Sequence, residues 1–580
     1  MTSKTESNFS NKKLKYMNSK KLLYFFTALL LLIGCTSKKN IVTKDVLVED
    51  LDSAINPADD FFEYTNGGWF KKNPIPPDWN FWGITAIVRE DIMMRLKTLN
   101  EEAAGRRGAI GSTDQKVGDF WTMAMDSIKT DSLGLKPLEQ FIEKINGITD
   151  LTSFADAIAE LQKVGSNKLF NNDVSQDEKN SNVMIYTLSQ GGIELPEREY
   201  YFKDDSATVN IRNKYKKYIT KLLILSGEDS GIAQTAGRRI LEIETNLAQI
   251  SQKVADTNSI WNYNKVGVPD LKKICGVIDL SSYLDKIGIR NCDSVVVYQI
   301  PFFKALNHIL KTTPIRDWKE YLKFHLLDDF ADVLPDAYGI EAFNFKQLFG
   351  GAKRRMVRWK RVIEMEDDMM GELVGKLYVK KYFSDKARQR YSGLVEALRD
   401  AMEDRIRNLN WMSDSTKQRA LIKLAALRKE VGYPDKWKDF SALKIGRESF
   451  AKNVLNLRRW WHDYQLDKLG RGPDHNEWGV APQMNNGYYD AGNNEIVLPA
   501  AFFIFHGLSD DEIDDAELYG YAGIKIGHEI GHGFDNGGRH TDENGHLKNW
   551  WTKKDENEFN KRADKLVKQF NEYEPIKGYT

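Results

Sequence analysis

The chain has 580 residues, of which 41% are hydrophobic, 11% aromatic and 29% charged, and its 83 basic residues equal its 83 acidic ones. This length allows large hydrophobic cores, and the aromatic content excludes a disordered polar chain. The neutral balance argues against a basic nucleic-acid-binding protein, and three cysteines are too few for a disulfide scaffold of this size.

The first residues have the layout of a secretory signal. Lys20 and Lys21 precede an apolar run, residues 22–34, that is too short to cross a bilayer but fits the apolar core of a signal peptide. The run ends in Leu-Ile-Gly-Cys, which resembles a bacterial lipobox. Residues 1–34 are therefore predicted to be removed, leaving Cys35 as the lipidated residue.

Two alternatives remain for this segment. Met17 can serve as the start, since residues 17–35 alone have the signal layout, and an uncleaved membrane-proximal helix is the other interpretation. Removal of residues 1–34 takes away six lysines and one glutamate, which leaves a net charge of −5. Residues 35–52 are polar and are expected to form a tether. We therefore expect a bacterial cell-envelope protein held by a lipid anchor, either periplasmic or surface-exposed.

The body of the chain favours a mainly helical fold with small β elements. Apolar residues recur at three- and four-residue spacing across residues 84–431, which predicts helices at 151–164, 208–226, 229–254, 391–411 and 416–431. Short apolar runs predict strands at 182–188, 295–300 and 495–498, and residues 473–494 have the composition of a loop. Cys275 and Cys292 are compatible either with a disulfide or with two free thiols.

Five of the nine histidines fall between His506 and His546, around the sequence His-Glu-Ile-Gly-His at residues 528–532. On a helix, His528 and His532 project from one face, a spacing that lets two imidazoles bind one Zn²⁺. Glu529 is then placed to take a proton from the attacking water. An apolar helical run, residues 519–526, leads into this motif and supports the interpretation.

Other residues near the motif have weaker assignments. Asp535 is a candidate hydrogen-bond partner for a liganding histidine, although a polar residue at a helix end is the simpler interpretation. Gly538 stands where a metzincin would have its third histidine, which excludes that class. His540 and His546 follow the helix and are predicted to be loop residues rather than ligands.

From about residue 56 to its end, the chain resembles the M13 zinc metallopeptidases, the neprilysin and endothelin-converting-enzyme family with bacterial oligopeptidase members. The matching segments are DDFFEY at 59–64, GGW at 67–69, QGG at 190–192 with LP at 195–196 and YY at 200–201, WM at 411–412, GYPD at 432–435, PQ at 482–483, NGYY at 486–489, HEIGHGFD at 528–535 and WWT at 550–552. Together these segments are far more specific than the histidine motif alone.

The resemblance implies a gluzincin-type zincin catalytic domain roofed by a large helical domain. It places the mostly helical N-terminal domain at residues 53–435, a connecting segment at 436–485 and the catalytic domain, in part, at 486–580. It implies one Zn²⁺ per chain, oligopeptide substrates and cleavage beside hydrophobic residues.

The resemblance also assigns roles to single residues. His528 and His532 match zinc ligands, Glu529 the catalytic base and Asp535 the hydrogen-bond partner of a histidine. Asn486 and Gly487 match the pair that binds the substrate backbone, although the family has alanine where this chain has Gly487.

One family feature is missing from this sequence. The family's third zinc ligand is a glutamate in an ExxxD motif after the histidines, and none of Glu543, Glu556, Glu558, Glu572 and Glu574 has aspartate four residues later. The C-terminal histidine and arginine of the family are not found either. We therefore expect these 580 residues to be a fragment or a truncated form that binds zinc weakly and has little or no activity.

The leading hypothesis is thus an envelope-anchored zinc endopeptidase, or a large piece of one. The alternative is a catalytically inactive lipoprotein that binds peptides or protein partners, against which the intact Glu529 argues. A helical scaffold with a coincidental histidine motif would require several segment matches to be accidental.

Overall fold

A computed structural model describes residues 48, 50–166, 168–257, 262–290 and 292–574. The chain divides into two compact units, Met1–Pro74 and Ile75–Thr580. In the first unit, α3 (Phe61–Lys72) begins after Asp60, whose side chain accepts a hydrogen bond from the Glu63 N–H at 2.9 Å. The predicted signal segment and Cys35 lie outside the described residues. Within the residues that are described, no helix combines the length and the apolar character needed to cross a membrane.

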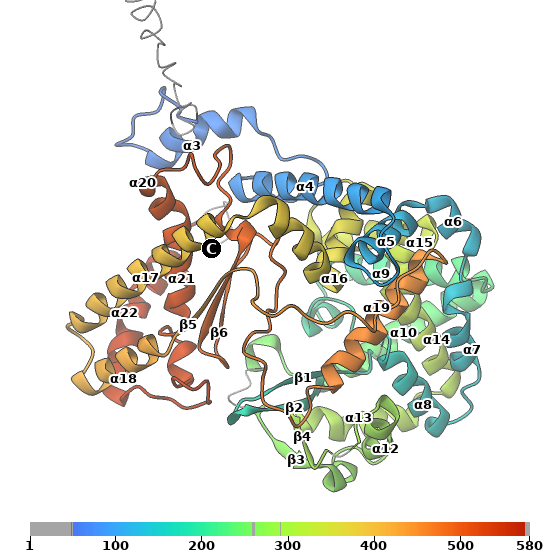
Figure 1. The fold of residues 1–580 in the computed structure, drawn as a ribbon. Coiled ribbons are helices and arrows are strands. Elements are labelled where there is room, and N and C mark those ends of the chain that lie inside the picture. The colour runs from blue at the N-terminus through green and yellow to red at the C-terminus, as the bar shows by residue number, and fades with distance from the viewer. Residues whose placement is uncertain (1–47, 49, 167, 258–261, 291, 575–580) are drawn as a thin grey trace, which may run out of the picture. The chain divides into compact units, whose positions relative to one another are not determined.

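The second unit is mainly helical, as predicted (Figure 1). Its α-helices are α4 (Ile84–Arg106), α5 (Thr113–Met125), α6 (Ser127–Leu133), α7 (Glu139–Asn146), α8 (Leu151–Gln162), α9 (Ser206–Leu225), α10 (Ser230–Ile250), α12 (Leu280–Ile287), α13 (Ile300–Thr312), α14 (Ile315–Asp329), α15 (Asp336–Gly350), α16 (Arg358–Tyr382), α17 (Asp385–Arg407), α18 (Asp414–Ala425), α19 (Phe450–Leu466), α20 (Asp515–Leu518), α21 (Ile524–His532) and α22 (Lys553–Asn571). The helices predicted at 151–164, 208–226, 229–254 and 391–411 correspond to α8, α9, α10 and α17, with shifted ends.

Two small sheets accompany the helices. The first has the order β1 (Phe170–Asp177), β2 (Asn180–Gln190), β4 (Ser294–Val297) and β3 (Lys265–Gly267), and only its β2–β4 pair is parallel. The second has the order β5 (Arg428–Gly432), β7 (Glu495–Pro499) and β6 (Tyr488–Asp490), with β5 parallel and β6 antiparallel to β7. The three predicted strands are confirmed as β2, β4 and β7, and β6 is an edge strand that lies within the predicted loop.

The helix predicted at residues 416–431 is wrong in its last turns. α18 ends at Ala425, and β5 pairs with β7 in the register Arg428↔Glu495 and Val431↔Leu498. The apolar spacing of this segment is compatible with both structures. These residues form a strand because β7, a buried strand much later in the chain, pairs with them in parallel and satisfies their backbone hydrogen bonds.

Buried side chains of the second unit form two hydrophobic cores. The first core combines α4, α5, α7–α10, α12–α16 and α19 with the four-stranded sheet. The second core combines α17, α18, β5, β7, α21 and the indole rings of Trp550 and Trp551. The residues of α17, α18 and β5 thus pack with the segment that carries the histidine motif, although they precede the connecting segment. The predicted domain boundaries stay a prediction.

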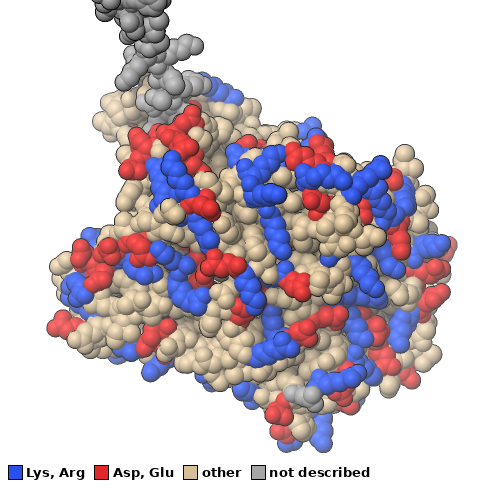
Figure 2. Space-filling view, viewed as in Figure 1, with Lys and Arg blue, Asp and Glu red and all other residues tan. Residues whose placement is uncertain are grey.

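Charged side chains of both signs are interspersed on the face shown in Figure 2. Between α4 and α16, for example, Arg89 pairs with Glu364 at 2.6 Å and Lys381 with Glu102 at 2.6 Å. Exposed pairs of this kind contribute about 0–1 kcal/mol each, so packing of the helices rests mainly on their buried apolar side chains. Cys275 and Cys292 are both free thiols, which decides between the two alternatives for them.

Candidate metal centre and peptide site

Helix α21 carries the histidine motif, and the packing of its apolar side determines the direction in which the two histidine side chains point. Ile526 and Ile530 are fully buried in the second core, which turns His528 and His532 toward solvent. The preceding turn, Tyr519–Gly523, is π-helical and follows α20. Asp514 and Glu517 form the capping box at the start of α20. The helical run predicted before the motif is therefore confirmed, with a π-helical turn inside it.

The two histidine rings converge on one point. Their Nε2 atoms lie 3.0 Å apart, and the rings stand at 78° to each other. The Nδ1 atom of His532 lies 2.9 Å from Asp535 Oδ2, so Nδ1–H donates to the carboxylate and the lone pair of Nε2 remains available to a ligand. The structure therefore brings His528, His532 and Asp535 together as the spacing predicted.

Asp535 is held as a carboxylate by its neighbours. Burial raises the pKa of this carboxyl, but the N–H groups of Gly538 and Gly537, each 2.8 Å from Oδ1, and the hydrogen bond with His532 more than offset that effect. Its pKa therefore lies below the ordinary value, and the group is an anionic acceptor at neutral pH. An acceptor of this kind fixes both the orientation and the tautomer of His532.

Glu529 lies on the same helix between the two histidines in sequence, and only 7% of its surface is exposed. Burial raises the pKa of this carboxyl above its ordinary value, against the opposing influence of His528, His532 and Lys525. A carboxylate with raised proton affinity beside two metal-type ligands is suited to accept a proton from water.

The donor set fits two positions of a zinc site. Neutral imidazole nitrogens are preferred zinc ligands, and these two are already directed to one point. Among the described residues, however, no group of three or more His, Cys, Asp or Glu side chains is arranged to hold a metal ion. The geometry thus accounts for two protein ligands.

The later candidates for a ligand are engaged elsewhere. Glu543 forms an ion pair with Arg419, and Glu556 lies 3.4 Å from an Arg539 nitrogen and 3.1 Å from Lys553. The nearby histidines are also occupied, since His540 Nε2 accepts from Arg539 at 3.3 Å and His546 Nδ1 lies 2.8 Å from Ser181 Oγ.

The predicted peptide-binding pair lies immediately before the edge strand β6. Asn486 is exposed, whereas Gly487 is buried. A Cβ atom at Gly487 would lie 2.9 Å from the Phe502 ring and 3.1 Å from both Leu498 Cδ2 and the Val497 carbonyl oxygen. Glycine is therefore a steric consequence of the packing of Phe502 in this chain. The free edge of β6 offers backbone groups to an extended peptide.

Tyr489 on β6 connects this strand to α21, the helix that carries His528 and His532 and is called the metal helix below. Its hydroxyl donates to Asn494 Oδ1 at 3.0 Å, and it lies 3.4 Å from where a Cβ of Gly533 would stand. Because side chains alternate along a strand, Tyr488 and Asp490 face the opposite side of the sheet.

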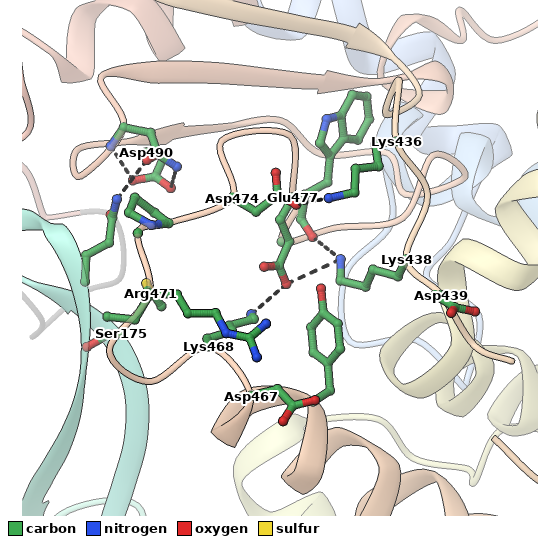
Figure 3. Close-up of a pocket in the computed structure, with 18 of the residues that line it drawn as sticks. Ser175, Lys436, Lys438, Asp439, Asp467, Lys468, Arg471, Asp474, Glu477 and Asp490 are labelled. Carbon is green, nitrogen blue, oxygen red and sulfur yellow. Dashed lines mark hydrogen bonds and ion pairs between the residues drawn. The ribbon is translucent and has the colours of Figure 1, made fainter. Parts of the chain in front are cut away.

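On that opposite side lies a cavity of about 640 Å³, lined in part by Tyr488 and Asp490 (Figure 3). Figure 3 shows Lys438 and Lys468 directed to Glu477, with ion-pair distances of 3.7 and 2.7 Å. The histidines of the motif do not line this cavity. Its lysines are paired, so it adds no reactive group to the metal centre.

Sequence reasoning missed Lys525, which the structure places in the vicinity of Glu529. Lys525 lies one turn before Glu529 on α21, and its ammonium lies 4.1 Å from the ring centroids of both Phe502 and Tyr521. The four-residue spacing to Glu529 is visible in the sequence, but the ring of Phe502 comes from another element.

Comparison with known proteins places both parts of the chain in one family. The two family models described as "Peptidase family M13" match residues 57–434 and 486–580. Endothelin-converting enzyme 1 of Mus musculus is 26% identical over 575 residues, covering 94% of this chain and 73% of that protein.

Solved structures agree with this result. The zinc metalloprotease Zmp1 of Mycobacterium tuberculosis, in complex with an inhibitor, superposes with a TM-score of 0.85 at 32% identity, covering 91% of this chain and 80% of that one. PepO from Lactobacillus rhamnosis HN001 has a TM-score of 0.82 at 22% identity, covering 89% and 82%, and supports the fold alone.

Proposed function

The chain belongs to peptidase family M13, the zinc metalloendopeptidases, and from this premise we propose that it hydrolyses oligopeptides by Glu529-assisted attack of water. The observation that carries the proposal is the convergence of the His528 and His532 Nε2 atoms, 3.0 Å apart, beside the carboxylate of Glu529. A peptide-binding protein without chemistry has no use for a buried carboxylate at this position.

The roles of the residues follow from their positions. His528 and His532 would hold zinc, with Asp535 fixing the tautomer of His532. When bound, zinc supplies a Lewis acid that polarises the scissile carbonyl and activates water. Glu529 accepts the proton of the attacking water and passes it to the leaving amine. The edge of β6 and Asn486 hold the peptide backbone in an extended form.

The substrate preference belongs to the same proposal. The family resemblance supports cleavage beside hydrophobic residues, and the half-buried ring of Tyr521, just before α21, supplies apolar surface. The buried ring of Phe502 contacts both Gly487 and Lys525, and so connects the proposed backbone-binding segment to the side of α21 next to Tyr521.

We further propose that a protein of these 580 residues binds zinc weakly. Two histidines are the only zinc-type ligands that converge among the described residues, and stable zinc sites use at least three protein ligands. Little or no peptidase activity is expected from this form.

Zinc content by mass spectrometry and hydrolysis of a fluorogenic peptide test both statements, with Glu529→Gln as the matched variant. Glu529→Gln keeps the size of the side chain and is expected to retain the zinc content while abolishing hydrolysis. Strong activity from the 580-residue protein would refute the two-ligand argument. Hydrolysis that survives Glu529→Gln would refute the role of the base.

The cellular location remains part of the proposal. The lipobox-like sequence ending in Cys35 supports a lipid anchor in a bacterial envelope. Labelling with a fatty-acid analogue in a bacterial host should mark the protein, and Cys35→Ala should abolish the label. Equal labelling of both forms would contradict the anchor.

A further inference from the structure

Lys525 places a positive charge in an aromatic setting close to the metal helix. It stands three residues before His528 and four before Glu529, which puts all three on one side of α21. Its ammonium lies 4.1 Å from each of the two ring centroids, those of Phe502 and Tyr521, and donates to the Phe502 carbonyl oxygen at 2.5 Å. Cation–π contacts at such distances hold an ammonium group in place.

The ammonium of Lys525 has no salt-bridge partner among the described residues. Glu529 is the acidic group that acts on it electrostatically. Burial lowers the pKa of this lysine to about 8, so it remains mostly protonated at neutral pH. The ammonium has three N–H donors, one of which goes to the Phe502 carbonyl, so donors remain for a ligand.

Phe502 connects this charge to the proposed peptide path. Its ring packs against Gly487 on one side and carries the Lys525 ammonium over its face. Gly487 immediately precedes the edge strand β6. Phe502 therefore contacts both the segment that would hold the peptide backbone and Lys525, and Lys525 in turn interacts electrostatically with Glu529, the carboxylate that would activate water.

We propose that Lys525, held in place by the buried ring of Phe502 and the half-buried ring of Tyr521, forms an anionic subsite that binds a carboxylate of the peptide close to the scissile bond. The inference rests on the proposed function and refines its substrate class: a peptide with an acidic side chain, or its own C-terminal carboxylate, set among hydrophobic residues. The half-buried ring of Tyr521 contacts the aliphatic part of the ligand, and the ammonium neutralises its charge.

The test is a set of peptides that differ in one carboxylate. Phe- and Ala-based hexapeptides carry Glu or the isosteric Gln at each position with an amidated C-terminus, and a third series has a free C-terminal carboxylate and no Glu. Their affinities for the zinc-supplemented protein are measured by competition in fluorescence anisotropy. Where a peptide is cleaved, the same ratios are taken from kcat/KM.

The protein variants separate charge from structure. Lys525→Met keeps the length of the side chain without its charge, and Lys525→Arg keeps the charge. Lys386→Met removes an exposed lysine, 81% accessible, from α17 as a control. Wild type is expected to favour Glu over Gln at one position by about 10-fold, which corresponds to about 1.4 kcal/mol, because only the charged side chain gains a charge-assisted hydrogen bond from the ammonium. Lys525→Met should reduce that ratio to about 1, while Lys525→Arg and Lys386→Met should retain it.

Each result of these binding measurements either supports or overturns the anionic subsite. A preference for the free C-terminal carboxylate instead of Glu supports the subsite and identifies the source of the carboxylate. Equal binding of all peptides by wild type overturns the inference alone, and so does a Lys525→Met variant that weakens all peptides by one factor. No binding of any peptide refutes the proposed function itself.

Discussion

Gly487→Ala is the sharpest test of how this chain departs from its family at the peptide site. The added methyl would lie 2.9 Å from the Phe502 ring and 3.1 Å from Leu498 Cδ2, closer than carbon atoms approach without strain. Overpacking of a buried site costs about 1–3 kcal/mol. Gly487 has no positive φ, so alanine also restricts the unfolded chain, which stabilises the protein by about 0.4–1 kcal/mol. The steric effect is larger, and a net loss of about 1–2 kcal/mol is expected.

The assay is chemical denaturation, monitored by tryptophan fluorescence, to which Trp550 and Trp551 of the second core contribute. Gly487→Ala and Phe502→Leu are measured singly and together as a double-mutant cycle. Phe502 is 1% exposed, so Phe502→Leu alone also lowers the free energy of unfolding. In that background the ring is gone, and Gly487→Ala should become neutral or stabilising because only the unfolded-state effect remains. An increase in stability from Gly487→Ala in the wild-type background would refute the reasoning. An equal loss in both backgrounds would show that Phe502 is not the cause.

Three further predictions concern the surroundings of the metal helix. Asp535→Asn should lower zinc affinity about 10–100-fold, measured by competition with a chelator, because the amide no longer holds His532 in one tautomer; unchanged affinity would contradict that role. Asp555 is fully buried, which alone would raise its pKa, but the hydroxyl and N–H groups that donate to it lower the pKa to about 2. The stability that this carboxylate contributes is therefore present above about pH 4 and is lost as the pH falls toward 2. Urea denaturation should show that the difference in the free energy of unfolding between wild type and Asp555→Asn becomes smaller over that pH range. A difference that stays constant would refute this prediction. Lys423→Met should remove the ammonium that donates to the Gly538 and Thr541 carbonyl oxygens at 2.8 and 2.7 Å, cost about 1–3 kcal/mol and speed amide exchange in the loop after α21; unchanged exchange would contradict this prediction.

The features that the sequence predicted correctly are those set by short spacings along one element. The positions of His528, Glu529 and His532 follow from helical geometry once a helix is assumed, and Asp535 lies one turn beyond His532. The long helices α9 and α10 also follow from their own apolar periodicity.

The features that were missed depend on partners far away in the chain. β5 was predicted as helix because its parallel partner β7 lies beyond the connecting segment. The setting of Lys525 needs the ring and the carbonyl group of Phe502, which follow β7. No local pattern contains either partner, so tertiary packing had to supply both.

The path of the backbone between the two cores has a mechanical consequence. The chain leaves the first core after α16, builds α17, α18 and β5 into the second, returns to the first at Phe440 and α19, and enters the second again before β7. A protease that nicks one of these connections leaves the others holding the two halves together. The half that carries the metal helix is therefore not a detachable C-terminal piece: residues 486–580 expressed alone would lack the walls that α17, α18 and β5 supply.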